Sequence, residues 1–286
     1  MINGPTKNSC YSISSQTKII AHIGYPTKTF TAPRILNPCF AELGVNLVVI
    51  PISCKACNLD KVFRGLIKVE NFFGALITMP HKQSVLPLLD YQSEMVSLST
   101  SCNILKLDNF NKIKGDMFDG AGLINLLYEK KIVIEKKSFL ILGSGGVGSA
   151  IAFSLALKGV KRIGIYDLDP IKSQRLYQSL NENFPGIDLN IWDKDKAKWE
   201  VLINATPVGM DGGAAVPIAL GYIQSAELIV DLVLSAHETT FVQLGREYGK
   251  MIISGIEILF AQIPEMLKFF GLKTLSKEEV MRLSPF

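Results

Sequence analysis

The sequence lacks the segments that would hold a protein in a membrane or direct it out of the cell. No apolar run among its 286 residues approaches the roughly 18 residues that are needed to cross a bilayer. The N-terminal stretch MINGPTKNSCYSISSQ is polar and contains no apolar core of the kind found in signal peptides. We therefore expect a protein of the cytoplasm that has no membrane partner.

Cysteine and histidine are too few and too scattered for a disulfide framework or a zinc site. The chain has 5 cysteines, an odd number, and 3 histidines, of which we expect His22 and His81 to be structural. Cys54 and Cys57 form one CxxC, but no second Cys or His pair follows at zinc-binding spacing. We expect reduced thiols and no metal ion. A thiol-redox role for the CxxC remains an alternative, although such motifs usually begin a helix and this one follows a strand-like run.

Charge of one sign is not concentrated in any part of the chain. The formal net charge is only +4, and the excess is spread over short lysine-containing segments such as KIKGD and DKDKAK. Proteins that bind nucleic acid gather their basic residues on one face, whereas scattered lysines are typical of a solvated surface. The sequence therefore predicts no nucleic-acid partner.

What the chain does contain is a regular alternation of strand-like and helix-like segments, typical of an α/β fold with mostly parallel sheets. Its length and its 48% of hydrophobic residues suffice for two domains. We expect an α/β domain over residues 1–120, a second domain over 121–255, and a terminal helical segment, 256–286, that packs back onto the first. Strands are expected at 18–24, 45–52, 74–79, 102–107 and 112–117, and in SFLIL, RIGIYD, LNIW, EVLINAT, LIVDLVL and KMIIS. Helices are expected at 59–72, from Pro80 to about Leu89, and at 122–130.

A glycine-rich turn opens the second domain. In FLILGSGGVGSA (139–150), Gly143, Gly145 and Gly148 follow a buried strand and begin a helix, the context in which GxGxxG is meaningful. These glycines permit a tight turn, the approach of backbone to a pyrophosphate, and close packing of helix on strand, while the helix N-terminus attracts phosphate. The pattern predicts a Rossmann doubly wound parallel sheet; the alternative is a glycine-rich turn without a ligand. The predicted cofactor-binding residues are Gly143, Ser144, Gly145, Gly146, Val147 and Gly148.

The next expected strand ends in an acidic residue, Asp167, about 20 residues beyond the turn. A carboxylate at this place bonds the ribose hydroxyls of NAD and repels the additional phosphate of NADP. Leu168 follows, and no Arg stands in the next four positions to neutralise that repulsion. The alternative role for Asp167 is to cap the following helix, which Asp169, directly before Pro170, suits better. We therefore expect NAD to be favoured over NADP, with Asp167 and Leu168 at the cofactor.

A lysine follows the strand in GALITMPHKQSV (74–85), where a buried strand ends. Lys82 lies either on the surface, as most lysines do, or at the rim of a cleft where the ends of parallel strands collect their chemistry. Oxidation of a secondary alcohol requires a base for the hydroxyl proton, and a lysine oriented by a nearby carboxylate can serve. Asp119 also follows an expected strand of the first domain, so strand ends can bring the two together.

The order of these motifs resembles that of one enzyme family. TMPHK, DGAG, LGSGGVGSA, INATPVGM and a late G-x-x-x-L-x-x-Q, spread from about Ile20 to Gly271, resemble shikimate dehydrogenase and its quinate/shikimate relatives. The resemblance implies an N-terminal substrate domain, a Rossmann domain for the nicotinamide cofactor, and a cleft between them. It also implies the interconversion of shikimate and 3-dehydroshikimate, with quinate as a further substrate of some members, a place in aromatic amino acid biosynthesis, and a monomer or homodimer.

The resemblance also assigns roles to individual positions. Lys82 and Asp119 correspond to the catalytic lysine and aspartate of the family. The positions that correspond to substrate-binding residues are Thr78, Asn103, Gln262 and, if its loop shifts register, Thr31. Two further positions, Thr206 and Gly255, correspond to cofactor-binding residues.

The chain departs from the family pattern where the substrate is bound. In TFTAP (29–33), Phe30 and Ala32 stand where the family has serines that hold the substrate carboxylate. We expect a more apolar substrate pocket. Such a pocket would either bind shikimate weakly or take another hydroxylated ring acid as its substrate. Two alternatives remain: a non-catalytic NAD-binding sensor, which would not need Lys82 and Asp119, and another α/β reductase, which would not need TMPHK. The other departures are Leu76, Met117-Phe118 and Leu234-Ser235-Ala236.

Overall fold

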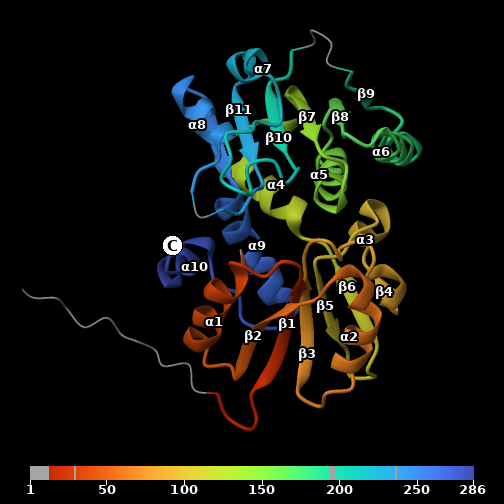
Figure 1. The fold of residues 1–286 in the computed structure, drawn as a ribbon, viewed down its shortest axis with the longest axis vertical. Coiled ribbons are helices and arrows are strands. Elements are labelled where there is room, and N and C mark those ends of the chain that lie inside the picture. Colours follow the sequence, from red (N-terminus) through yellow and green to blue (C-terminus); the bar gives the residue numbers. More distant parts are fainter. Residues whose placement is uncertain (1–12, 29, 194–197, 236) are drawn as a thin grey trace, which may run out of the picture.

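The structure is a computed structural model that describes residues 13–28, 30–193, 198–235 and 237–286. It contains two six-stranded sheets, one in the lower and one in the upper half of the molecule as drawn, with α4 and α9 where the halves meet (Figure 1). The fold class expected from the sequence is therefore confirmed: two α/β sheets follow one another along the chain. Within the described residues, no helix is long and apolar enough to cross a membrane.

The first sheet is mixed. Its strands lie in the order β2-β1-β3-β5-β6-β4, with parallel pairing from β2 to β3 and antiparallel pairing from β3 to β6. Helices α1 and α10 with α9 cover one face and α2 and α3 the other, as the two apolar clusters show. The strands are β1 (Lys18–Gly24), β2 (Leu47–Ser53), β3 (Phe72–Ile77), β4 (Tyr91–Gln92), β5 (Ile104–Leu107) and β6 (Ile113–Asp116). The helices are α1 (Ala32–Glu42), η1 (Ala56–Asn58), α2 (Leu59–Leu66), η2 (Leu86–Leu88) and α3 (Glu94–Ser99).

The second sheet is parallel throughout, in the order β12-β11-β10-β7-β8-β9 of a doubly wound Rossmann domain. Helices α4, α5 and α6 cover one face of this sheet, and α7 and α8 cover the other. Residues of each group of helices share a hydrophobic cluster with alternate residues of the strands. The strands are β7 (Ser138–Leu142), β8 (Arg162–Tyr166), β9 (Asp188–Ile191), β10 (Val201–Asn204), β11 (Leu228–Asp231) and β12 (Met251–Ser254). The helices are α4 (Asp119–Glu129), η3 (Ile134–Lys136), α5 (Gly146–Leu157), α6 (Pro170–Asn183), α7 (Leu220–Ser225) and α8 (Thr240–Glu247).

The C-terminal helices return to the first sheet. Helix α9 (Gly255–Phe269) begins directly after β12, and α10 (Lys277–Leu283) follows it. Leu259, Phe260 and Ile263 of α9 share an apolar cluster with Ile20 of β1 and Phe40 of α1. Burying so many large side chains stabilises the return, because each contributes roughly 1.5–3 kcal/mol when fully covered.

Two local expectations were wrong, and helix α1 was not expected. The segment from Pro80 to about Leu89 is not a helix but a series of turns with the short η2, because Pro87 removes a backbone donor inside the expected helix. The helix expected over 59–72 ends at Leu66, and its last residue already belongs to β3. Helix α1 was missed; it has Pro33 in its first turn, where proline is tolerated, and Pro38 inside.

Candidate active site

The site begins where two strands of the first sheet end. Lys82 follows β3 through a turn, and Asp119 follows β6 as the first residue of α4. The Lys82 ammonium donates a hydrogen bond to Oδ2 of Asp119. The exposed fractions of the two side chains are only 15% and 10%, so the ion pair is largely withdrawn from water. A lysine and a carboxylate in such contact can hold a proton and pass it to a neighbouring oxygen.

A buried asparagine fixes the second oxygen of this carboxylate. Asn103, just before β5, donates from Nδ2 to Oδ1 of Asp119 over 2.9 Å. Its own Oδ1 accepts a hydrogen bond from the backbone N–H of Phe118 at 3.1 Å. Each carboxylate oxygen of Asp119 therefore has a donor, and the carboxylate is held toward Lys82. Asn103, which the resemblance assigned to the substrate, makes its described contacts with the Asp119 segment.

The glycine turn of the second sheet lies against Lys82. Ser101 donates from its hydroxyl to the backbone oxygen of Gly146 at 2.9 Å. A Cβ atom added to Gly146 would lie 3.1 Å from Cβ of Ser101 and 3.3 Å from Cβ of Lys82. Even an alanine at 146 would therefore require Ser101 or Lys82 to shift beside the ion pair.

The other glycines of the turn are required by backbone geometry. Gly143 has φ of +102°, a conformation that residues with a side chain rarely adopt. A Cβ on Gly148 would overlap the carbonyl oxygen of Gly143, so helix and turn approach more closely than any other residue permits. Gly145 is the N-cap of α5 and offers no side-chain acceptor, which leaves the N–H groups of the first turn for a ligand.

A polar atom inside the turn also lacks a partner. The hydroxyl oxygen of Ser144 is buried and, among the described residues, accepts and donates no hydrogen bond. Buried polar groups almost always have partners, so this hydroxyl fits a site whose ligand supplies the missing one. A dinucleotide pyrophosphate, which brings several acceptor oxygens, fits both the hydroxyl and the helix N-terminus.

Asp167 lies beside the same turn. Its Oδ2 accepts from the backbone N–H of Ser144 at 2.7 Å, and its Oδ1 accepts from that of Asp169 at 2.9 Å. Asp169 is the N-cap of α6 and accepts a hydrogen bond from the backbone N–H of Ile171. Asp169 therefore caps the helix, while Asp167 bonds the glycine turn. Leu168 is 87% exposed.

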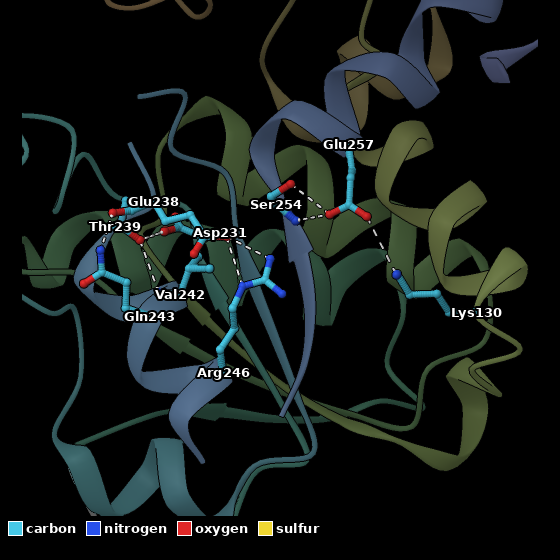
Figure 2. Close-up of polar contacts among 9 residues, drawn as sticks. All are labelled: Lys130, Asp231, Glu238, Thr239, Val242, Gln243, Arg246, Ser254 and Glu257. Carbon is cyan, nitrogen blue, oxygen red and sulfur yellow. Dashed lines mark hydrogen bonds and ion pairs between the residues drawn. The ribbon is translucent and has the colours of Figure 1, made fainter. Parts of the chain in front are cut away.

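Adjacent strands of the second sheet end in a buried polar network, of which the sequence analysis named only Thr206; Figure 2 shows Asp231 and Thr239 of this network. Asp231, the last residue of β11, accepts from the hydroxyl of Thr239, from the backbone of Val233 and, at 3.0 Å, from Nδ2 of Asn204. Asn204 in turn accepts from the hydroxyl of Thr206 at 2.6 Å. Burial raises the pKa of Asp231 above its usual value. The signal in the sequence was a polar residue at the end of each apolar strand, INAT and IVDL.

Gly255 and Gln262 lie on α9. A Cβ on Gly255 would be 2.7 Å from the backbone oxygen of Val233, so close packing at the start of the helix explains this glycine. Beside it, Ser254 and Glu257 form a capping box, and Glu257 is 3.7 Å from Lys130 (Figure 2). Gln262 is buried against Gly122 of α4, one turn after Asp119.

The remaining substrate positions lie at the end of β1. Thr78 donates its N–H to the carbonyl of Ile23, and Thr31 is the N-cap of α1. Phe30, also in this loop, stacks its ring on the imidazole of His22. Two other departures from the family pattern, Leu76 and Met117, belong to the apolar core. Thr29 and Ala236 lie outside the described residues.

The surroundings of Cys54 do not favour a reactive thiol at this position of the CxxC. Cys54 is buried directly after β2, and its carbonyl contacts Nε2 of His81 at 2.7 Å. Burial, and secondarily Cys57, raises the pKa of Cys54, whereas reactive thiols have a lowered pKa. Within the described part of the chain, no three His, Cys, Asp or Glu residues form a group that could hold a metal ion.

Comparison with known proteins places the motifs in context. The family model for the shikimate dehydrogenase substrate binding domain matches residues 22–105, and the model for the ThiF family matches residues 125–178. A shikimate dehydrogenase (NADP(+)) of Alkaliphilus oremlandii is 31% identical over 262 residues, which is 88% of this chain and 91% of the relative. The enzyme of the same name from Halothermothrix orenii is 29% identical over 270 residues, 91% of this chain and 93% of the relative.

Solved structures give the same result for the fold. Shikimate dehydrogenase from Aquifex aeolicus superposes with a TM-score of 0.83 at 25% identity, over 95% of this chain and 99% of that one. A shikimate 5-dehydrogenase from Listeria monocytogenes, solved in complex with shikimate and NAD, gives a TM-score of 0.82 at 23% identity, over 95% and 97% of the two chains. The likeness extends over both sheets.

Proposed function

Since this chain belongs to the shikimate dehydrogenase family, we propose that it interconverts a secondary hydroxyl and a ketone on shikimate or a related hydroxylated ring, with a nicotinamide dinucleotide. The observation that carries the proposal is the contact of Lys82 with Asp119 directly beside the glycine turn. Residues 1–120 with 256–286 would form the substrate domain and 121–255 the cofactor domain. The packing of α9 on β1 and α1 supports this division.

In this proposal Lys82 is the acid and base. A nicotinamide dinucleotide held by the glycine turn would supply the hydride acceptor for the oxidation and the hydride donor for the reduction. In the oxidation direction the neutral amine of Lys82 takes the hydroxyl proton, and in the reduction direction its ammonium returns the proton to the oxygen. Asp119 orients the lysine through Oδ2, and Asn103 holds Asp119 through Oδ1.

The cofactor would be held by backbone more than by side chains. Residues 143–148 present the N–H groups of α5 and the Ser144 hydroxyl to the pyrophosphate. Thr206, fixed by Asn204, and Gly255, at the start of α9, would line the same edge of the sheet. Substrate contacts are assigned to Thr78, Gln262 and Thr31, which lie around the first-sheet strand ends and on α9.

We further propose that NAD is favoured over NADP. The relatives above carry NADP(+) in their names, so this chain would differ from them at its second Rossmann strand. The support is local: Asp167 is fixed at the turn by Ser144, and the exposed Leu168 supplies no positive charge for a 2′-phosphate.

Quinate is a further candidate substrate, because the ion pair acts on a secondary hydroxyl whatever the remaining substituents of the ring. The structure does not favour a role as a non-catalytic sensor of NAD. Such a sensor has no need for a largely buried ion pair of Lys82 and Asp119 that Asn103 holds in place.

The test is a panel of shikimate, quinate and related hydroxylated rings with NAD and with NADP, followed by nicotinamide absorbance. The proposal expects turnover of at least one ring alcohol, which is lost in Lys82→Ala. If no alcohol in the panel is oxidised, although NAD binding is measured by calorimetry, the dehydrogenase assignment is wrong and the sensing alternative stands.

A further inference from the structure

Phe30 and His22 form an aromatic pair next to the candidate substrate site. Their ring centroids are 4.0 Å apart and the ring planes differ by 25°, which is a stacked arrangement. His22 belongs to β1, and Phe30 to the loop that leads into α1. The pair therefore lies at the same edge of the first sheet as Thr78 and Lys82.

The position of the Phe30 ring is fixed by close contacts around Gly24. A Cβ atom on Gly24 would overlap Cγ2 of Thr78 and would lie 2.7 Å from Cζ of Phe30. The tip of the ring and the methyl group of Thr78 thus converge on one point above the end of β1. A substrate that contacts Thr78 consequently meets an aromatic ring at this point.

The charges at this edge do not favour an anionic substituent. Burial and then the charge of Lys82 lower the pKa of His22 to about 3, so its imidazole is neutral at pH 7. Among the described residues, Lys82 is the charged group that lowers the pKa of His22. The Lys82 ammonium is already paired with Asp119. A carboxylate placed beside the stacked Phe30 and His22 rings would lose its hydration without gaining an ion pair of its own.

The imidazole does offer a hydrogen bond to an uncharged group. Nδ1 of His22 is buried and has no hydrogen-bond partner among the described residues. A neutral imidazole nitrogen can donate to or accept from a hydroxyl, whichever tautomer it adopts. An uncharged hydroxylated ring would bury its apolar face against the side of Phe30 that His22 leaves open, and a hydroxyl that reaches past the edge of Phe30 would give Nδ1 the partner that it lacks.

We infer that this pocket selects an uncharged hydroxylated ring over the corresponding ring acid, and that Phe30 and His22 are the residues that decide the selection. The inference rests on the proposed dehydrogenase activity and names the substrate class of the same site. It also changes the role of His22, which the sequence analysis expected to be structural.

The experiment compares shikimate with its methyl ester, which has the same ring and reacting hydroxyl but no charge. We expect kcat/KM of the unmodified protein to be about tenfold higher for the ester, chiefly through KM, because an unpaired charge is penalised on binding. Equal values, or a preference for the acid, overturn the inference and leave the proposed function standing. If neither compound nor any other ring alcohol is oxidised, the proposed function fails instead.

One variant and its control test whether Phe30 causes the preference for the ester over the acid. Phe30→Ser should lower the ester-to-acid ratio at least fivefold by improving the acid, since a hydroxyl replaces the ring. Phe110→Ser, at an exposed phenylalanine between β5 and β6, is the matched control and should leave the ratio unchanged. An unchanged ratio in a folded, active Phe30→Ser overturns the assignment of Phe30.

Discussion

The carboxyl edges of the two sheets differ in how they are built. At the second sheet, the turn over residues 143–148 is determined by backbone: one glycine has positive φ, and another allows helix and turn to touch. At the first sheet, the candidate chemistry depends on side chains that meet from separate segments, Lys82, Asp119 and Asn103. Backbone requirements tolerate little change, whereas side chains beside the reacting group can be exchanged without loss of the fold. This difference explains how a chain can keep a family's cofactor turn and differ in its substrate pocket.

The largest expected effect comes from the first edge. Lys82→Ala should lower kcat by about 10²-fold or more and leave the Kd for NAD nearly unchanged, because it removes the general base and not the glycine turn. Steady-state kinetics and calorimetry on the same preparation measure the two quantities. Lys112→Ala is a matched control, since it removes a lysine from an exposed ion pair with Asp90. Retention of most activity in Lys82→Ala would show that the base lies elsewhere.

A smaller effect is expected at the second edge, in the choice of cofactor. The unmodified protein should prefer NAD by about 10- to 100-fold in kcat/KM, because Asp167 repels the 2′-phosphate at a partly screened site. Asp167→Ser with Leu168→Arg should shift the ratio toward NADP. Lys161→Ala serves as the control, because this exposed lysine directly precedes β8, at the edge of the sheet opposite the glycine turn. A tenfold preference for NADP in the unmodified protein would contradict the prediction and indicate Lys172 or Arg175 as the phosphate ligand.

The smallest predicted effect concerns stability and again separates the two regions. The pKa of His22 is about 3 in the folded chain against an ordinary 6.5, so the unfolded chain binds a proton that the folded chain does not between these values. Stability is therefore retained above pH 6.5 and decreases as pH falls toward 3. Between pH 6 and pH 5 the loss from this residue is about 1 kcal/mol.

The measurement is urea unfolding at these two pH values. His22→Gln should lose this part of the pH dependence, and His237→Gln, an exposed histidine of the second half, should keep it. Equal pH dependence in both variants would mean that His22 is protonated in the folded chain.

The sequence was informative where local geometry decides the outcome. The glycine turn, the flanking strand β7 and helix α5 follow from apolar runs and steric requirements within 20 residues, and the structure has them as expected. The turns after Pro80 were expected to be helical, but Pro87 interrupts the segment. Even so, Lys82 reaches Asp119, since both lie at strand ends of one sheet.

What the sequence could not predict depends on contacts between distant segments. Asn103 was predicted at the substrate from the resemblance alone; its hydrogen bonds to Asp119 and to the backbone of Phe118, 15 or 16 residues further along the chain, could not be predicted from any local pattern. Leu76 was expected to change the pocket, but it faces the core. The role of Phe30 depends on its stacking with His22, and no local pattern in the sequence reveals which ring covers which.

The central claim is that Lys82 and Asp119 act as one unit on the substrate oxygen. A double-mutant cycle in kcat tests it most directly, with Lys82→Ala, Asp119→Asn and both changes together. The account predicts that each single change lowers kcat by about 10²-fold or more and that the double variant is within about threefold of Lys82→Ala, because Asp119 acts through the lysine. A double variant whose loss is the product of the two single losses would show independent roles and contradict the account.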